Sequence, residues 1–256
     1  MYDTLWIGCS HSTGIYELDN KLDTCRKSGI PQKIKKRFSQ NWKIISCPGE
    51  GIFKYAQVIK TLEKHNMLSK FRNIIVQKTF EPRLTITADD TGQFRDVLDY
   101  MKSDSQETLS LYREHLFHMS PLGTYEMLKE RQLPKNADKV ILDWTTELYS
   151  KIDPREYNTF MPSPWVDVCN DYIKDAAKRN KLNYYEFSWI RGFRELLPVD
   201  ADKPHDIING DRDIVDWLTE QKLKQYLSTP GSHPTEKVVN EVSRMLVKEL
   251  RKNGYK

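Results

Sequence analysis

The sequence predicts a single α/β domain with a mostly parallel sheet packed between helices. Short apolar runs alternate along the chain with segments whose apolar residues recur at helical spacing. This order of strand, helix and strand implies parallel pairing through right-handed crossovers. The chain has 256 residues, enough to bury one sizeable core, and no stretch rich in Pro, Gly or Ser divides it. We therefore expect one domain over residues 1–256, with a helical insertion in about 90–160.

The first two predicted strands lie close to the beginning of the chain. The apolar run Thr4–Gly8 stops on a tight turn, and polar, irregular chain is expected from there to about residue 41. Lys43–Cys47 is the second predicted strand, and it ends at a segment with two glycines, Gly49 and Gly51. A helix is expected next, because four apolar residues share one face: Ile52, Tyr55, Ile59 and Leu62.

The remaining elements continue the alternation. Phe71–Gln77 is the third predicted strand, and a mostly helical pattern is expected from Asp96 to Ile152. A helix over Val166–Arg179 and a fourth strand over Asn183–Phe187 follow. The last predicted helix has apolar residues on one face, namely Val238, Val242, Met245, Leu246 and Leu250.

The composition narrows the class of protein. The net charge of +4 and the mean hydropathy of −0.68 are typical of a soluble protein, and no apolar segment is long enough to span a bilayer. The first residues lack the basic start and apolar stretch of a secretory signal. The four cysteines are widely spaced, with no Cys-x-x-Cys pair for zinc or redox chemistry. We expect reduced thiols, a cytoplasmic protein, no metal and no organic cofactor.

A serine and a histidine near the two chain ends suggest nucleophilic catalysis. Ser10 follows the first predicted strand, at the carboxyl edge where open α/β sheets place their sites. His233 precedes the last predicted helix, and Pro234 suits the first turn of that helix. A serine is a poor nucleophile until a base removes its proton, so this pair suggests a serine hydrolase. The alternative is that Ser10 caps a helix starting near Ser12 and that His233 is a cap or a surface residue.

These residues resemble the SGNH, or GDSL-like, hydrolase superfamily. That family carries its nucleophile in a Gly-Asp-Ser block after the first strand and its histidine in an Asp-x-x-His-Pro block before the last helix. Gly8-Cys9-Ser10 and His233-Pro234 match these blocks in placement and order. The resemblance implies a three-layer α/β/α sandwich, similar to the flavodoxin-like folds, with Ser10 as nucleophile and His233 as base.

Two middle blocks of the family supply its oxyanion hole. Gly49 or Gly51 occupies the place of the family's glycine, whose N–H joins that of Ser10. The segment Ile74–Arg83 resembles the third block of a divergent, often virus-encoded subgroup, in which a Gln-x-Thr/Ser motif ends in arginine. Gln77 or Thr79 is then the side-chain donor, because amides and hydroxyls both carry donors. The alternatives are that the glycines only supply turn geometry and that Gln77 satisfies a neighbouring backbone group.

Two positions depart from the family pattern. Cys9 stands beside the nucleophile, where the family has an aspartate that is not catalytic. Pro230 stands where the family's orienting aspartate is expected, and losing that acid in a triad can lower turnover by about 10⁴-fold. A Ser–His dyad oriented by a backbone carbonyl, a carboxylate from another segment, and loss of the chemistry all stay open. The candidate carboxylates are Asp200, Asp202, Asp206, Asp211 and Asp213.

A basic segment suggests a different function. Residues 26–43 carry seven basic and no acidic residues, with Phe38 and Trp42 available for stacking on bases. The alternative is a solvated, mobile face, which we favour because the net charge is far below that of a typical nucleic-acid-binding domain.

The sequence therefore predicts a serine esterase or deacylase that acts on a small acyl ester, such as an O-acetyl sugar. Arg83, Trp165 and His11 are candidate substrate contacts, although a histidine beside the nucleophile is expected to face solvent. We expect a small-molecule or glycan partner, no nucleic acid and no membrane, in the host cytoplasm or a virion if the protein is viral. The rival is a non-catalytic SGNH-like protein retained for binding or assembly on a virus particle. The oligomeric state is not indicated.

Overall fold

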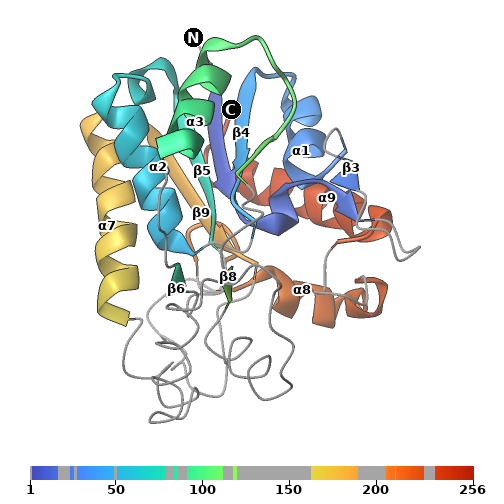
Figure 1. Cartoon of the computed structure of the whole chain (residues 1–256). Coiled ribbons are helices and arrows are strands. Elements are labelled where there is room, and N and C mark those ends of the chain that lie inside the picture. The colour runs from blue at the N-terminus through green and yellow to red at the C-terminus, as the bar shows by residue number, and fades with distance from the viewer. Residues whose placement is uncertain are drawn as a thin grey trace, which may run out of the picture.

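The computed structural model describes residues 2–16, 24–25, 28–48, 51–78, 84–85, 91–111, 118–119, 163–189, 206–210, 212–227 and 234–256. A five-stranded sheet runs through the described residues in the order β7-β4-β1-β5-β9, and each neighbouring pair is parallel. These strands are Leu109–Ser110 (β7), Trp42–Ser46 (β4), Thr4–Gly8 (β1), Asn73–Lys78 (β5) and Asn183–Ser188 (β9). Helices cover both faces of this sheet (Figure 1). The predicted three-layer α/β/α fold with a parallel sheet is confirmed.

The strands bury both of their faces, because their side chains alternate between two apolar clusters. Leu5 and Ile7 of β1 join the cluster under helices Ile52–Lys64 (α2), Thr91–Lys102 (α3) and Ser163–Arg179 (α7). Trp6 joins the cluster under helices Ile30–Phe38 (α1), Ile214–Glu220 (α8) and Glu236–Lys252 (α9). A sheet covered on both faces needs continuous apolar strands, and this is why β1 and β4 are buried along their whole length.

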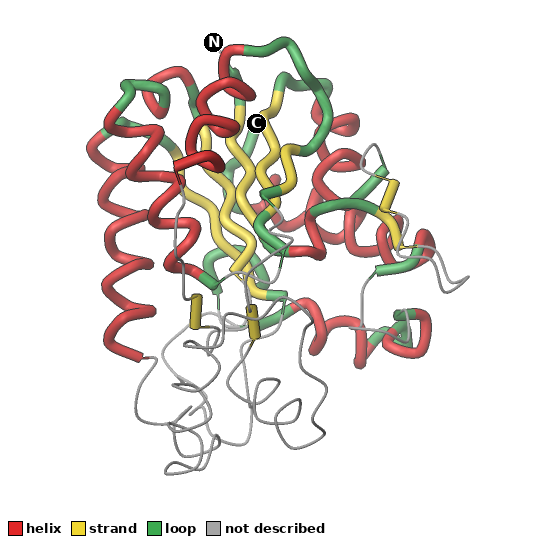
Figure 2. The backbone as a smooth tube through the Cα atoms, viewed as in Figure 1, coloured by secondary structure: helices red, strands yellow, loops and turns green. Residues whose placement is uncertain are grey.

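Short elements complete the described chain (Figure 2). Three 3₁₀ turns lie at Ser10–Ser12 (η1), Leu68–Lys70 (η2) and Lys224–Tyr226 (η3). Ile15–Tyr16 (β2) pairs with Thr24–Cys25 (β3), and Leu84–Thr85 (β6) pairs with His118–Met119 (β8), both antiparallel. Of the predicted insertion over about 90–160, α3, β7 and β8 are described and the rest lies outside the described residues. The helical insertion and the single domain therefore stay predictions.

The predicted irregular chain before residue 41 is wrong, because part of it forms helix α1. Gly29 is the N-cap and Pro31 lies in the first turn, where its missing N–H costs nothing. Ile30 and Ile34, one turn apart, are buried against α9. The basic residues that masked this spacing lie in the last turn, where they complement the helix dipole.

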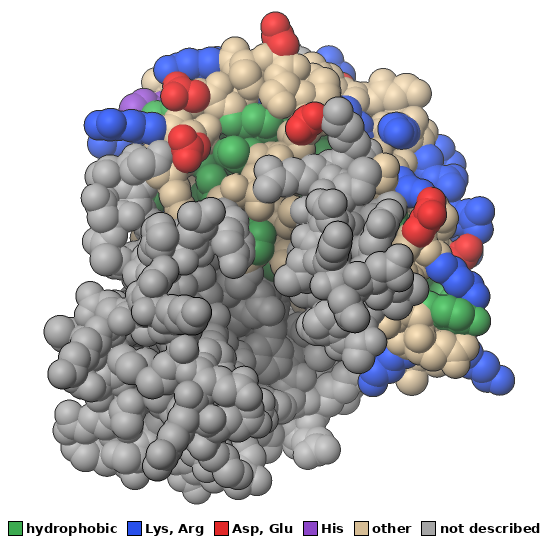
Figure 3. Space-filling model, turned by 45° about the vertical axis from the view of Figure 1, so that its right-hand side comes forward, with side chains coloured by type: hydrophobic (Ala, Val, Ile, Leu, Met, Phe, Trp, Pro, Cys, Tyr) green, Lys and Arg blue, Asp and Glu red, His purple; other side chains and the backbone are tan. Residues whose placement is uncertain are grey.

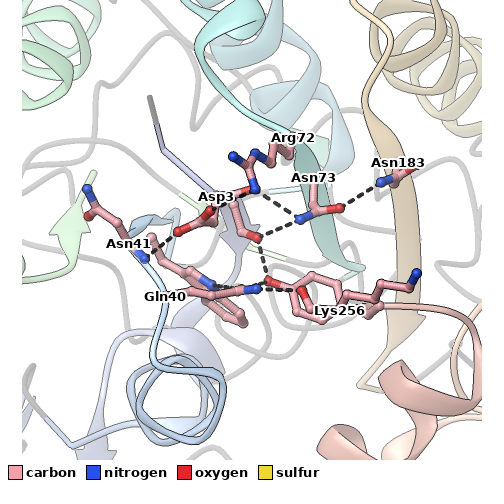
Figure 4. Close-up of polar contacts among 10 residues, drawn as sticks. Asp3, Gln40, Asn41, Arg72, Asn73, Asn183 and Lys256 are labelled. Carbon is pink, nitrogen blue, oxygen red and sulfur yellow. Dashed lines mark hydrogen bonds and ion pairs between the residues drawn. The ribbon is translucent and has the colours of Figure 1, made fainter.

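A polar network joins the strand beginnings at the amino edge of the sheet (Figure 4). Asp3 lies at its centre, since its carbonyl oxygen accepts from the Asn73 amide, and one carboxylate oxygen accepts from Asn41 N at 2.8 Å. Asn183 donates to Asn73 Oδ1 at 2.9 Å, which links β9 to β5. Gln40 Nε2 donates to the Lys256 carbonyl oxygen, so the last described residue is tied to the same edge. These bonds fix where the parallel strands start relative to one another.

Candidate functional site

The chain around Ser10 lies at the switch point of the sheet. β1 pairs with β4 on one side and β5 on the other, and the chain reaches β4 first and β5 second. Open α/β sheets bind ligands beyond the carboxyl ends of the strands at this point. Ser10 is the first residue of η1, two residues after β1 ends, and its exposed fraction is 8%. The structure therefore places the predicted nucleophile at the position that this fold class uses for sites.

The turn that carries Ser10 is held by bonds to its own backbone and to β4. Ser12 N donates to the Cys9 carbonyl oxygen at 2.9 Å, and Thr13 N donates to the Ser10 carbonyl oxygen at 3.0 Å. Ser46 Oγ, at the end of β4, also donates to the Cys9 carbonyl oxygen at 2.9 Å, and its distance to Thr13 Oγ1 is 2.5 Å. The backbone at Ser10 is thus anchored on two sides.

Gln77 lies beside this turn near the carboxyl end of β5. Its side chain is 1% exposed; Oε1 accepts from the Ser12 hydroxyl, and Nε2 lies 3.3 Å from Cys9 Sγ. Ser12 Oγ in turn accepts from Trp6 Nε1 at 2.8 Å. The structure therefore places Gln77 beside the turn that carries Ser10. Among the described residues, the hydrogen-bond partners of the Gln77 side chain are the side chains of Ser12 and Cys9 rather than backbone groups.

His11 does not face solvent, so that expectation is wrong. It is 7% exposed, and its ring stacks on Trp189 at 4.3 Å between centroids and an angle of 22°. Nδ1 lies 3.1 Å from Cys9 Sγ. Trp189 follows β9 directly, and its N–H donates to the Lys78 carbonyl oxygen at 3.2 Å. A residue distant in sequence thus buries His11, and nothing in the local sequence around His11 predicts this.

Gly51 is the N-cap of α2 and lies at the same edge of the sheet. Its backbone is extended, with φ of −94° and ψ of −178°, and its carbonyl oxygen accepts from Lys54 N at 3.1 Å. The first N–H groups of a helix have no partner within the helix, and the helix dipole makes them favourable to negative charge. The N-terminus of α2 can therefore contribute to an oxyanion hole.

Several predicted site residues cannot be placed. Outside the described residues lie His233, Pro230, Gly49, Thr79 and Arg83, and the side chain of Trp165 in α7 is not described. The described residues next to His233 are fixed. Pro234 forms an isolated antiparallel bridge with Leu227, and Thr235 Oγ1 donates to the Tyr226 carbonyl oxygen at 2.6 Å. The beginning of α9 is thereby attached to the segment that follows α8.

Two of the five candidate carboxylates are described, and their surroundings differ. Asp206 pairs with Lys252 Nζ at 2.6 Å on the surface. Asp213 is 1% exposed and caps α8, with Oδ1 accepting from Asp216 N at 2.7 Å. Val215, two residues later, donates its N–H to the Trp189 carbonyl oxygen at 3.1 Å. Asp213 is therefore the buried carboxylate close to the chain that covers His11.

Some of the lysines in the basic segment are engaged in contacts within the protein. Lys43 is fully buried, and its Nζ donates to three carbonyl oxygens after or at the end of α3, those of Tyr100, Ser103 and Ser105. Lys33 Nζ bonds to Asn240 Oδ1 and lies 3.8 Å from Glu236 Oε1. Lys and Arg side chains lie beside acidic ones on the surface at the right of Figure 3. Lys43 is thus unavailable to a phosphate backbone.

The described residues hold neither a metal-binding cluster nor a membrane-spanning helix, and three of their cysteines are free thiols. Among the described residues, no group of three or more His, Cys, Asp or Glu side chains could hold a metal ion. Cys9, Cys47 and Cys169 are buried free thiols. No helix in the described part of the chain is both long and apolar enough to cross a membrane.

Comparison with known proteins yields one structural neighbour of low similarity. No family model matches the chain, and no curated protein matches it. Among solved structures, the chain is similar to the crystal structure of the lipase/acylhydrolase from Enterococcus faecalis, at 13% identity and a TM-score of 0.36. The match covers 99% of this chain and 97% of that chain.

Proposed function

We propose that this chain is a serine esterase or deacylase of SGNH type, acting on a small acyl ester such as an O-acetyl sugar. The observation that carries the proposal is the place of Ser10, on an anchored turn at the switch point with Gln77 beside it. A nucleophile needs donors close by for the charge that develops on the carbonyl oxygen. Gln77 and the N-terminus of α2 at Gly51 supply such donors from two different elements.

The proposed reaction has two halves. Ser10 Oγ attacks the acyl carbon while His233 takes the hydroxyl proton, and His233 then protonates the leaving alcohol. Water next attacks the acyl-enzyme, again with His233 as base, and releases the acid. The N–H groups of Ser10 and of Gly51 or Gly49, with Gln77 or Thr79, would bind the oxyanion in both halves. Arg83, Trp165 and His11 are the proposed substrate contacts, and of these His11 is buried next to the nucleophile.

We further propose Asp213 as the acid that replaces the missing aspartate at position 230. Its burial and its link to Trp189 through Val215 support this choice. If Asp213 has no such role, the remaining forms of the mechanism are a Ser–His dyad and a triad with Asp200, Asp202 or Asp211.

The nucleophile is tested with a fluorophosphonate probe and with p-nitrophenyl acetate. Ser10→Ala and His233→Ala should each abolish labelling and lower kcat by about 10³-fold or more, because the nucleophile and its base act as one unit. Ser69→Ala, a serine of η2 outside the site, is the matched control and should keep the wild-type rate. Turnover that persists in both Ser10→Ala and His233→Ala would contradict the proposal.

The acid is tested separately with Asp213→Asn. Asparagine caps a helix as well as aspartate does, so the melting temperature should be unchanged while the carboxylate charge is removed. We expect kcat to fall by about 10²- to 10⁴-fold and the apparent pKa of the base to fall, since an acid stabilises the imidazolium. Asp206→Asn is the control, and equal rates for the two variants would contradict the proposed role of Asp213.

The second candidate function is a non-catalytic SGNH-like binding or virion-associated protein. Pro230 at the position of the family's acid favours it. The likeness of the third block to a virus-encoded subgroup is part of the same proposal, as is a location in the host cytoplasm or the virion. This candidate predicts no labelling of wild-type protein at Ser10 but a stable complex with a glycan or a protein, measured by pull-down. Labelling that requires Ser10 and His233 would exclude it.

A further inference from the structure

Three buried side chains form one hydrogen-bonded chain beneath the nucleophile turn. Trp6 Nε1 donates to Ser12 Oγ at 2.8 Å, and the Ser12 hydroxyl donates to Gln77 Oε1. Each of the three side chains is about 1% exposed. Trp6 comes from β1, Ser12 from η1 and Gln77 from β5, so the chain connects the two strands of the switch point with the turn between them.

The bonds of this hydrogen-bonded chain run from Trp6 to Gln77. An indole N–H can only donate, so Ser12 Oγ must accept from Trp6. A serine hydroxyl has a single proton, and toward Gln77 that proton needs an oxygen as its acceptor. The Ser12 hydroxyl donates to Oε1, so Oε1 is on the Ser12 side of the amide. Nε2 then faces Cys9 Sγ, 3.3 Å away, on the side of the nucleophile turn.

Close packing at Gly8 keeps the hydrogen-bonded side chains of Ser12 and Gln77 in place. A Cβ at Gly8 would overlap Ser12 Oγ and would lie 2.6 Å from Gln77 Oε1. The Ser12 and Gln77 side chains therefore occupy the space that any other residue at this position would need. Gly8 belongs to the turn motif, but this reason for glycine is visible only once Gln77 is placed.

We propose that Ser12 is a positioning residue, which holds the Gln77 amide with its N–H₂ group toward the nucleophile turn. The inference rests on the proposed function and deepens it, because it selects Gln77 as the side-chain donor to the oxyanion. One N–H of Nε2 is directed to Cys9 Sγ, and the second N–H of the amide is the donor assigned to the oxyanion. With the amide reversed, a carbonyl oxygen would face the developing negative charge.

A double-mutant cycle between Ser12 and Gln77 tests this role. Gln77→Glu keeps the acceptor for Ser12 but replaces the N–H₂ group with oxygen, and it should lower kcat by about 10²- to 10³-fold with KM little changed. Ser12→Ala leaves both amide orientations accessible and should lower kcat by about 10-fold. The variant with both changes should be no slower than Gln77→Glu alone, because Ser12 acts only through Gln77.

Ser46→Ala provides the matched control for a buried hydroxyl of the same turn. Ser46 contacts the Cys9 carbonyl oxygen and Thr13, and no bond to Gln77 is found among the described contacts. Its effect on kcat should multiply with that of Gln77→Glu. If Ser12→Ala does not fold, Ser12→Cys has nearly the same volume and only a weak S–H donor, and it should give the same pattern with a smaller loss.

The outcomes separate this inference from the proposed function. Turnover that does not depend on Ser10 would remove the proposed function and the inference with it. Ser10-dependent turnover in which the Ser12 and Gln77 effects multiply would overturn the inference alone, because Ser12 would then act through the general stability of the turn. The positioning role would be established if turnover depends on Ser10 and Ser12→Ala does not lower kcat further when Gln77→Glu is already present.

Discussion

The two edges of the sheet both carry dense polar contacts, but the contacts join different parts of the chain. At the amino edge, side chains bond both to backbone groups and to one another, as Asn73 Nδ2 does to the Asp3 carbonyl oxygen at 3.1 Å and to Thr4 Oγ1 at 3.3 Å. These contacts join the beginnings of the strands. At the carboxyl edge, the contacts from Trp6 through Ser12 and Gln77 to Cys9 surround the turn that carries Ser10. Under the proposed function, we therefore expect changes at the amino edge to act on stability and changes at the carboxyl edge to act on turnover.

Of the variants that compare the two edges, Gly8→Ala at the carboxyl edge should have the largest effect. A Cβ there would overlap Ser12 Oγ and displace the Gln77 amide. We expect kcat for p-nitrophenyl acetate to fall at least about 10-fold, and the free energy of unfolding to fall by about 1–3 kcal/mol from overpacking. Steady-state kinetics and urea unfolding measure the two effects. A variant with wild-type kcat would mean that the Ser12–Gln77 chain does not orient the site.

Asn73→Ala at the amino edge should give the opposite pattern. The Asn73 side chain is 6% exposed and bonds to the Asp3 carbonyl oxygen, Thr4 Oγ1 and Asn183 Nδ2. Removing it leaves buried polar groups without these partners, which costs about 1–3 kcal/mol in the free energy of unfolding. kcat at a temperature well below the melting transition should stay within about twofold of the wild type. If kcat falls by more than the loss of stability explains, the proposed difference between the two edges would be wrong.

Tyr100→Phe tests a buried phenol beside the beginning of β4. Burial raises the pKa of Tyr100 to about 12, against a hydrogen bond from Ile44 N that lowers it. In the unfolded chain the phenol ionises near pH 10, so the folded state holds its proton longer, and stability should fall as pH rises from about 10 to 12. Tyr100→Phe has no phenol to ionise, so its free energy of unfolding should depend less steeply on pH in this range, by up to about 1.4 kcal/mol per pH unit. Urea unfolding at several pH values measures it, and an unchanged slope would contradict the assignment.

The smallest expected effect is that of Arg72→Ala. Arg72 Nη1 lies 3.8 Å from Asp3 Oδ1, and the Arg72 side chain is 68% exposed. Exposed ion pairs contribute about 0–1 kcal/mol and weaken with salt, so the free energy of unfolding should change by less than about 0.5 kcal/mol. Asn73 is the next residue in the chain, and Asn73→Ala should lower the free energy of unfolding by more. The comparison tests whether burial decides how much a contact at this edge contributes to stability.

Much of the fold follows from local pattern. The strand at Thr4–Gly8 begins and ends as predicted, and β4 differs from the predicted strand by one residue at each end. Helix α1 was missed because its buried apolar residues are few, namely Ile30, Pro31 and Ile34, and the helix is buried by its contact with α9. Helix α8 has 7 residues and β7 has 2, and both are too short for periodicity to reveal.

The candidate site divides in the same way. Ser10 was identified from its place after the first strand, whereas Gly51 and Gln77 became candidates through the resemblance of their segments to blocks of the SGNH hydrolases. Ser12 and Trp6 were not identified, since their role depends on contact with Gln77, which is 65 residues from Ser12 in the chain. A signal existed, because Ser12 is a second hydroxyl residue two positions after Ser10, in the same short turn.

By itself the sequence determined the class of fold, the order of most elements and the position of the serine at a strand end. These depend on periodicity and turn residues, which act over a few positions and can be recognised in the sequence. Only the tertiary structure decided that His11 is buried against Trp189 and that Lys43 Nζ donates to a carbonyl oxygen of α3. It also decided which way the Gln77 amide points. Each of these depends on a partner brought close by folding, and a hydrogen bond has a direction only when both of its ends are in place.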